Sequence, residues 1–166
     1  MTITVSGKVW KFGPDINTDY MAPSFIKGME WDEAKTHILH IHPGFGPGFQ
    51  PGDVIVAAAN FGCGSSRQTG PLNLQRLGVG CVVAESFARI FYRNSMAIAF
   101  PLLACPGIAD AFEEGDQLEM EFETSVVRNL TQGTEFTGNP PPADLIRIVK
   151  AGGIGEVLKA EARGGG

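Results

Sequence analysis

The chain has 166 residues, of which 43% are hydrophobic and 19% charged, a composition typical of one domain with a buried core and not of a disordered chain. The net charge of −5 gives no basic surface for nucleic acid, and no apolar run approaches the roughly 20 residues that span a bilayer. The opening letters, MTITVSGKVW, lack the basic and apolar regions of a signal peptide, so we expect a cytoplasmic protein without nucleic-acid or membrane partners.

The first third of the chain combines one predicted strand with a long irregular segment. Residues 3–12 are β-branched and aromatic, which predicts a strand or a hairpin. Residues 20–52 contain many prolines and glycines, and a loop of this length inside a domain is usually functional or mobile. A short helix is predicted within it at 31–39, where apolar side chains recur at helical spacing.

The middle of the chain alternates predicted strands with predicted helices. The apolar run at 53–59 is typical of a strand buried on both faces, and a helix that ends near Leu77 should follow it. A second strand at 81–85, a helix at 87–97 and a third strand at 100–104 continue the pattern. This alternation predicts βαβ units and a parallel sheet.

The last third adds a predicted antiparallel flank and two helices. Residues 118–122 and 126–130 alternate as strands do, and three prolines at 140–142 open a helix that should run to about Lys150. A last helix is expected at 156–162, with a frayed tail at 163–166. The predicted fold is α/β: a single domain over 1–166, with a partly parallel sheet flanked by helices.

The segment NFGCGSSR, at 60–67, carries the strongest sign of a functional site. Its glycines allow a tight turn and a close approach of the backbone to a ligand. Ser65 and Ser66 precede a predicted helix and are expected to cap its N-terminus, where free N–H groups favour an anion. Arg67 adds a planar guanidinium suited to a carboxylate or phosphate. The alternative is a glycine-rich turn with a serine cap and a surface arginine.

Two well-known phosphate motifs are absent from this segment. The chain has no GK[ST] at the spacing of a Walker loop, and serines and Arg67 occupy the later positions of a GxGxxG motif. The residues alone therefore predict an anion site and leave its ligand open between carboxylate and phosphate.

Cysteines and histidines do not predict a metal site in this chain. Cys63, Cys81 and Cys105 are widely spaced, whereas iron–sulfur clusters usually need about three or four clustered thiolates. If a cluster is involved, another chain should carry it. Cys63 could be a nucleophile, but a small buried or semi-buried thiol is the favoured interpretation. The three histidines at 37, 40 and 42 are expected to face solvent.

Long blocks of the sequence resemble a known family. NFGCGSSR and GCVVAESFARIFYRNSMAIAFPLL, at 60–67 and 80–103, are similar to the small subunits of isopropylmalate isomerases and homoaconitases, which themselves resemble the swivelling domain of aconitase. GKVWKFGPDINTD at 7–19 and AGGIGEVLK at 151–159 match the beginning and the end of the same family. The resemblance spans nearly the whole chain, although residues 24–50 match poorly.

The resemblance implies a swivel-type β/β/α domain that closes over a [4Fe–4S] cluster held by a large partner subunit. It also implies that Ser65 removes a proton next to a carboxylate of a small hydroxy-carboxylate substrate. Ser66 and Arg67 would bind that carboxylate, and Asp19 would reach the same cleft. Arginine suits this role because deprotonation next to a carboxylate builds negative charge on its oxygens.

Two positions bear on the choice of substrate. Where the family usually continues with Glu-His, this chain has Gln68 and Thr69, a change that affects the substrate more than the reaction class. In this family a loop beyond the TD motif resembles a specificity determinant, with a basic residue accompanying an extra carboxylate. Lys27 stands at or near that position and predicts a substrate with a third carboxylate. The alternative is that Lys27 points to water.

The predicted function is therefore the small subunit of a hydro-lyase that dehydrates and rehydrates a 2-hydroxy di- or tricarboxylate, of the isopropylmalate or homoaconitate type. A hydratase of a substituted maleate is the alternative within the enzyme class, favoured by Gln68 and Thr69. A carboxylate-binding or assembly module without catalysis is the alternative outside it. A neighbouring gene for a cluster-binding large subunit would favour the enzymes.

Overall fold

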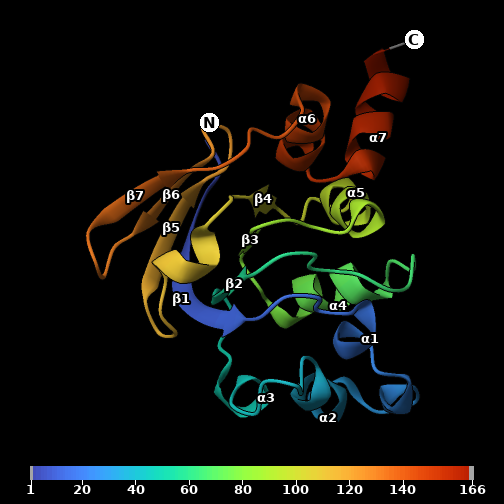
Figure 1. The fold of residues 1–166 in the computed structure, drawn as a ribbon. Coiled ribbons are helices and arrows are strands. Elements are labelled where there is room, and N and C mark those ends of the chain that lie inside the picture. Colours follow the sequence, from blue (N-terminus) through green and yellow to red (C-terminus); the bar gives the residue numbers. More distant parts are fainter. Residues whose placement is uncertain (1, 165–166) are drawn as a thin grey trace.

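A curled, mixed β-sheet forms the centre of the computed structural model, which describes residues 2–164 (Figure 1). Within these residues the sheet has seven strands in the order β4-β3-β2-β1-β5-β6-β7. Strands β1 to β4 are parallel, and β5 to β7 continue the sheet antiparallel from β1. The strands are β1 (Thr4–Phe12), β2 (Val54–Ala57), β3 (Val82–Ala84), β4 (Leu102–Ala104), β5 (Gln117–Glu121), β6 (Val126–Asn129) and β7 (Thr134–Thr137). The predicted α/β fold with a partly parallel sheet is confirmed.

The parallel half follows from the sequence pattern. Strand β2 is buried along its whole length, as its run of apolar letters predicts. Helix α4 (Thr69–Leu77) links β2 to β3, and helix α5 (Arg89–Ala97) links β3 to β4. Gly78 ends α4 in the left-handed conformation, with φ at 102°, that glycine adopts at low cost. The expected order of strands and helices in this region is confirmed.

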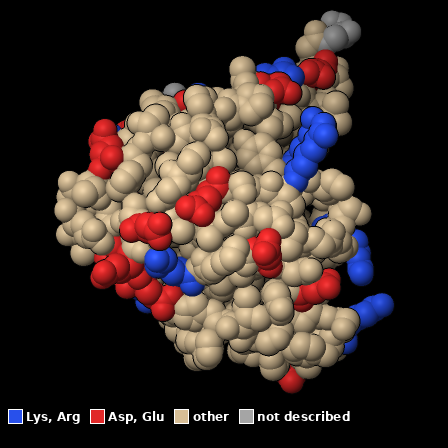
Figure 2. Space-filling model, in the orientation of Figure 1, with Lys and Arg blue, Asp and Glu red and all other residues tan. Residues whose placement is uncertain are grey.

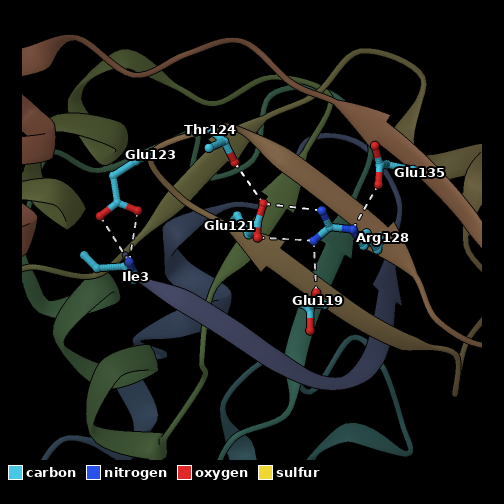
Figure 3. A network of polar contacts seen from close by, with 7 residues as sticks. All are labelled: Ile3, Glu119, Glu121, Glu123, Thr124, Arg128 and Glu135. Atoms are coloured by element: carbon cyan, nitrogen blue, oxygen red, sulfur yellow. Dashed lines mark hydrogen bonds and ion pairs between the residues drawn. The ribbon is translucent and has the colours of Figure 1, made fainter. Parts of the chain in front are cut away.

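The antiparallel half is held by an ion-pair network on one face of the sheet. Figure 3 shows the guanidinium of Arg128 between the carboxylates of Glu119, Glu121 and Glu135. Its Nη1 lies 3.0 Å from Glu119 Oε1, and its Nε donates to Glu135 Oε2 at 2.9 Å. These hydrogen bonds, those to Glu121 and Glu135 first, raise the pKa of Arg128. Strand β7, which brings Glu135, was not predicted, because its letters TEFT are short and mostly polar.

The segment between β1 and β2 contains more regular structure than the sequence predicts. Five short helices occur there, and four of its large apolar side chains, Met21, Ile38, Leu39 and Phe45, are fully buried in the common core. The expected irregular loop is thus a series of short turns around buried anchors. Its helices are α1 (Thr18–Met21), η1 (Ser24–Ile26), α2 (Trp31–Ala34), η2 (Lys35–His37) and α3 (Phe45–Gly48). Its mobility stays a prediction.

The C-terminal region adds helices at one end of the sheet (Figure 1). Helix η3 (Ile108–Ala111) packs against β2 and β3, while α6 (Ala143–Ala151) begins directly after the three prolines and packs against α5. Helix α7 (Ile154–Gly164) is longer than expected. The fraying of its end stays a prediction, and residues 165–166 lie outside the described range. No helix within residues 2–164 combines the length and apolarity needed to cross a membrane.

Candidate functional site

The loop after β2 is locked against the turn that follows β1. Gly62 N donates to Ile16 O at 2.8 Å, and Thr18 N donates to Cys63 O at 2.8 Å. Gly62 and Gly64 have φ angles of 88° and 102°, a region that side-chain-bearing residues rarely adopt. A Cβ at Gly62 would lie 2.1 Å from a ring carbon of Phe91, so only glycine fits there. These contacts place the carboxyl ends of two neighbouring parallel strands at one site, where open α/β sheets bind ligands.

The hydroxyl of Ser65 accepts two hydrogen bonds from one arginine. The backbone N–H and the Nε of Arg67 each donate to Ser65 Oγ at 3.2 Å. The backbone N–H of Ser65 donates to Thr18 Oγ1 at 3.0 Å, which fixes the serine relative to the β1 turn. Donors aimed at an oxygen stabilise negative charge on it, and a guanidinium does so more strongly than a neutral donor. Ser65 Oγ is therefore the oxygen of this loop best placed to become an alkoxide.

Helix α4 begins later than the sequence predicts. Its first residue is Thr69, and its N-cap is Gln68, whose side chain makes no capping hydrogen bond. The expectation that Ser65 and Ser66 cap this helix is therefore wrong. Ser65 instead accepts its hydrogen bonds from Arg67, two residues on, in an extended stretch between Gly64 and Gln68.

An open cavity of about 800 Å³ lies between this loop, α4 and the short helices that follow β1. Four of the five predicted site residues line it: Ser65, Arg67, Asp19 and Lys27. Ser66 does not, and its carbonyl oxygen accepts a hydrogen bond from Asn94 Nδ2 on α5 at 2.9 Å. The structure thus brings together residues from three separate parts of the chain.

The cavity wall carries more positive than negative charge. Arg67, Lys27 and Arg76 line it, whereas Asp19 is its one acidic residue among those that the structure describes. Within residues 2–164, none of these three cations has a carboxylate oxygen within 4.0 Å. Figure 2 shows the wider trend, with most acidic side chains of this face over the sheet and several basic ones along the right edge, on the side of α1, α4 and α5. The cavity suits an anion with more than one negative group.

Sequence reasoning missed several residues of the cavity. Thr18 was overlooked although it adjoins Asp19, and its hydroxyl holds Ser65. Trp31 and Arg76 also line the cavity, and the guanidinium carbon of Arg76 lies 4.0 Å from the centroid of the Trp31 ring. Arg76 could have been found from its spacing, because it lies seven residues after Thr69 and shares its helix face. Trp31 carried no such signal, since only the fold brings it to α4.

Comparisons with known proteins show which family the chain belongs to. The model of the Aconitase C-terminal domain family matches residues 46–103, which include the loop after β2 and helices α4 and α5. The 3-isopropylmalate dehydratase small subunit 1 of Methanopyrus kandleri is 43% identical over 97% of this chain and 96% of its own length. The isopropylmalate/citramalate isomerase small subunit of Methanocaldococcus jannaschii is 42% identical over 96% of each chain. This chain belongs to the 3-isopropylmalate dehydratase small-subunit family.

The family fold is recovered in three dimensions as well. A crystal structure of 3-isopropylmalate dehydratase from Methanocaldococcus jannaschii superposes with a TM-score of 0.87, at 30% identity, over 96% of both chains. The superposition covers both halves of the sheet. The family membership that the sequence blocks predicted is thus supported by sequence and structure alike.

The thiols of this dehydratase-family chain do not fit an iron–sulfur cluster. Burial raises the pKa of the Cys81 thiol to about 12 and also raises that of Cys105, which disfavours the thiolate that a metal requires. Within the described residues no three side chains of His, Cys, Asp or Glu are grouped for a metal ion.

Two histidines depart from the expected exposure. The side chain of His42 is 19% exposed, packs against Trp10 and Phe12, and hydrogen-bonds Glu114. His37 is half-buried beside Phe25. The expectation of a solvent-facing histidine is wrong for His42, because it packs against side chains of β1, and it holds only in part for His37. His40 is exposed and lies at the cavity wall.

Proposed function

We propose that this chain is the small subunit of an aconitase-type hydro-lyase that interconverts 2-hydroxy di- or tricarboxylates by removing and re-adding water. The names of its relatives, which are dehydratase and isomerase small subunits, support the reaction class. The observation that carries the proposal is the pair of N–H donors from Arg67 on Ser65 Oγ, at the wall of a cavity rich in unpaired cations.

In the proposed step, Ser65 as an alkoxide takes the proton from the carbon next to a carboxylate. The electron pair of that C–H bond becomes the second bond of a new carbon–carbon double bond. The hydroxyl leaves from the adjacent carbon with its own bonding pair, so the substrate loses one proton and one hydroxide, together one water. Rehydration with the opposite regiochemistry would complete an isomerisation. The donors on Ser65 Oγ lower the cost of its charge in both directions.

The remaining residues of the cavity are proposed to hold the substrate. Nε of Arg67 is committed to Ser65, whereas its Nη atoms make no hydrogen bond among the described residues and are free for a carboxylate. Asp19 at the same wall is suited to accept from a substrate hydroxyl. Ser66 does not line the open cavity, so its hydroxyl would have to turn toward the cavity to meet the same carboxylate. Lys27 is proposed to face a further carboxylate.

The partner is proposed to be a large subunit that binds a [4Fe–4S] cluster. The relatives' names describe small subunits, which implies a larger companion. Ser66 and Arg67 are exposed here, and an alkoxide and a carbanion-like state both require a dry site. Docking of the partner over the open cavity would provide that site, so activity is expected only in the assembled complex.

The experiment that tests the proposal is the Ser65→Ala variant in the complex with its large subunit. We expect kcat to fall by about three decades or more, with KM little changed, because only the proton transfer is lost. Ser6→Ala, an exposed serine on β1 away from the cavity, is the matched control and should keep wild-type turnover. Near-wild-type kcat in Ser65→Ala would assign the base to another residue.

Arg67→Lys in the same complex tests the planar guanidinium. An ammonium cannot donate to Ser65 Oγ and bind a carboxylate with two parallel hydrogen bonds at once. We therefore expect both a higher KM and a lower kcat, which steady-state kinetics would separate. A change in KM alone would mean that Arg67 binds substrate without assisting Ser65.

A hydratase of substituted maleates is the second candidate. Thr69 favours it, because this residue lines the cavity where the family usually has a histidine. A panel of substituted maleates and 2-hydroxy acids on the assembled complex would decide between the two, since only an isomerase interconverts two hydroxy acids.

A further inference from the structure

Helix α4 forms one long wall of the cavity. Thr69, Asn73 and Arg76 all line it, at spacings of four and three residues that place them on one helix face. At 1.5 Å of rise per residue, Arg76 lies about 10 Å along the helix from Thr69, and thus far from the Ser65 end. The cavity is therefore elongated, with a cation at each end of this wall.

Arg76 is held in place without being neutralised. Its guanidinium carbon lies 4.0 Å from the centroid of the Trp31 ring, in the stacked range of cation–π contacts. A cation–π contact does not neutralise the guanidinium, so its N–H donors can still bind an anion. Among residues 2–164 no carboxylate pairs with it, although several surface cations of this chain do find such partners. Trp31 thereby organises a cation whose donors are unused.

We propose that Arg76 is a specificity residue that binds an anionic group at the far end of the substrate's third substituent. A malate skeleton carries its two carboxylates on adjacent carbons, so both lie near Ser65 and Arg67. Arg76 begins about 10 Å along α4 from Thr69, so it suits a carboxylate on a longer substituent better than these two. The planar guanidinium of Arg76 can donate two parallel hydrogen bonds to a carboxylate. It would therefore favour a substituent that ends in a carboxylate over an alkyl substituent of the same length.

This inference rests on the proposed function, because it assigns the substrate class of the same cavity. It adds a second cation, from α4, to the one that Lys27 offers from the loop after β1. The alternative role of Arg76 is structural, as a clamp between α4 and α2 through Trp31. The two roles differ in what a substitution changes: a clamp affects all substrates alike, whereas a carboxylate receptor affects only those that carry the distal carboxylate.

The test compares two substrates in the assembled enzyme, one a malate with a substituent ending in a carboxylate and the other with an alkyl substituent of equal length. In Arg76→Gln the ratio of their kcat/KM values should fall about tenfold or more against the wild type, or ~1.4 kcal/mol, mainly through KM. Arg76→Lys should restore part of the ratio, because it restores the charge. Arg163→Gln, on exposed α7, is the control and should leave the ratio unchanged.

Two outcomes would overturn the inference. The first is an unchanged ratio of the two kcat/KM values in Arg76→Gln. The second is an equal loss of kcat/KM for both substrates together with a lower melting temperature, which is the result expected of a structural clamp. Binding of butane-1,2,4-tricarboxylate, whose third carboxylate lies one carbon further out, to the complex, measured by calorimetry in wild type and Arg76→Gln, separates this inference from the proposed reaction. A loss of affinity in the variant would support the carboxylate receptor even in a complex that hydrates none of the tested substrates.

Discussion

At the scale of single residues, Ser65 and Arg67 form a unit. Both hydrogen bonds that Ser65 Oγ accepts come from Arg67, one from its backbone and one from its side chain. The backbone donor survives any substitution of Arg67, whereas the Nε donor does not. The double variant Ser65→Ala, Arg67→Lys should therefore lose less activity than the product of the two single losses, because residues that act together are not additive.

A second prediction concerns the role of Lys27 in substrate choice. Its side chain is exposed at the cavity wall, at the end of η1. If it binds a third carboxylate, Lys27→Val should shift the kcat/KM ratio from a tricarboxylate towards an alkyl-substituted malate by about tenfold or more, or ~1.4 kcal/mol. Lys159→Val, an exposed lysine on α7, serves as the control. An unchanged ratio would mean that Lys27 only faces water.

At the scale of elements, the loop between β2 and α4 depends on glycines that no other residue can replace. A Cβ at Gly64, where φ is 102°, would lie 2.5 Å from Oδ1 of Asn17, the atom that accepts the N–H of Asp19. Gly64→Ala should therefore destabilise the chain by about 1–3 kcal/mol and displace Ser65, with a clear loss of kcat. Gly13→Ala, with nothing within 4 Å of its Cβ, is the control. Thermal unfolding and turnover of the complex would measure both effects.

The turn before β5 gives a pH-dependent prediction. Asp116 Oδ2 accepts the backbone N–H of Glu113 at 2.9 Å and the side-chain amides of Asn129 and Gln132 at 2.8 Å each, and these bonds lower its pKa. A lowered folded-state pKa stabilises the fold above the unfolded value, near 3.8, and this stabilisation is lost as pH falls through the folded pKa.

Asp116→Asn should consequently cost about 1–3 kcal/mol of the free energy of unfolding at pH 7, because the three donors would meet a neutral amide oxygen in place of a charged carboxylate oxygen. Below about pH 4 the gap between wild type and variant should narrow. Asp110→Asn, exposed on η3, is the matched control. Urea unfolding at several pH values would measure the effect, and a gap that is constant down to pH 2 would contradict it.

Long periodic elements could be predicted from the sequence, and short ones could not. The buried run of β2 and the helical spacing of α5 are strong patterns, and they suffice for the parallel half of the sheet. The helices after β1 have three or four residues each, too few to show a period, so their anchoring by Phe45 and Ile38 appears only in the fold. Within the cavity, the motif around Ser65 could be recognised from the sequence, whereas the contact of Arg76 with Trp31 depends on tertiary structure.

In the molecule as a whole, the cavity and the main ion-pair network lie on different halves of the sheet. The cavity lies beside the parallel half, at the carboxyl ends of β1 and β2, while the antiparallel half carries the Arg128 network (Figure 3). The ion pairs of Arg128 lie on the sheet and not at the cavity. Substitution of this network should therefore change stability more than substrate choice.

The isolated chain can be used to test whether the iron–sulfur cluster belongs to the partner subunit. Cys81 and Cys105 are buried in the core, apart from the half-buried Cys63, so the described residues provide no clustered thiolates. Anaerobic treatment of the chain alone with iron and sulfide should leave no cluster absorbance and no hydratase activity. A stable four-iron cluster on the isolated chain would contradict the two-subunit proposal.

The anchoring of the segment after β1 has an evolutionary consequence. Met21 before it and Ile38 and Leu39 after it are fully buried, while Ser24, Phe25 and Lys27 between them are exposed at the cavity wall. The part of the chain that is proposed to meet a substituent is thus anchored at both ends, while its exposed residues contribute little to the core. Selection can vary these few letters with little penalty in stability, so new substrates can arise on an unchanged scaffold.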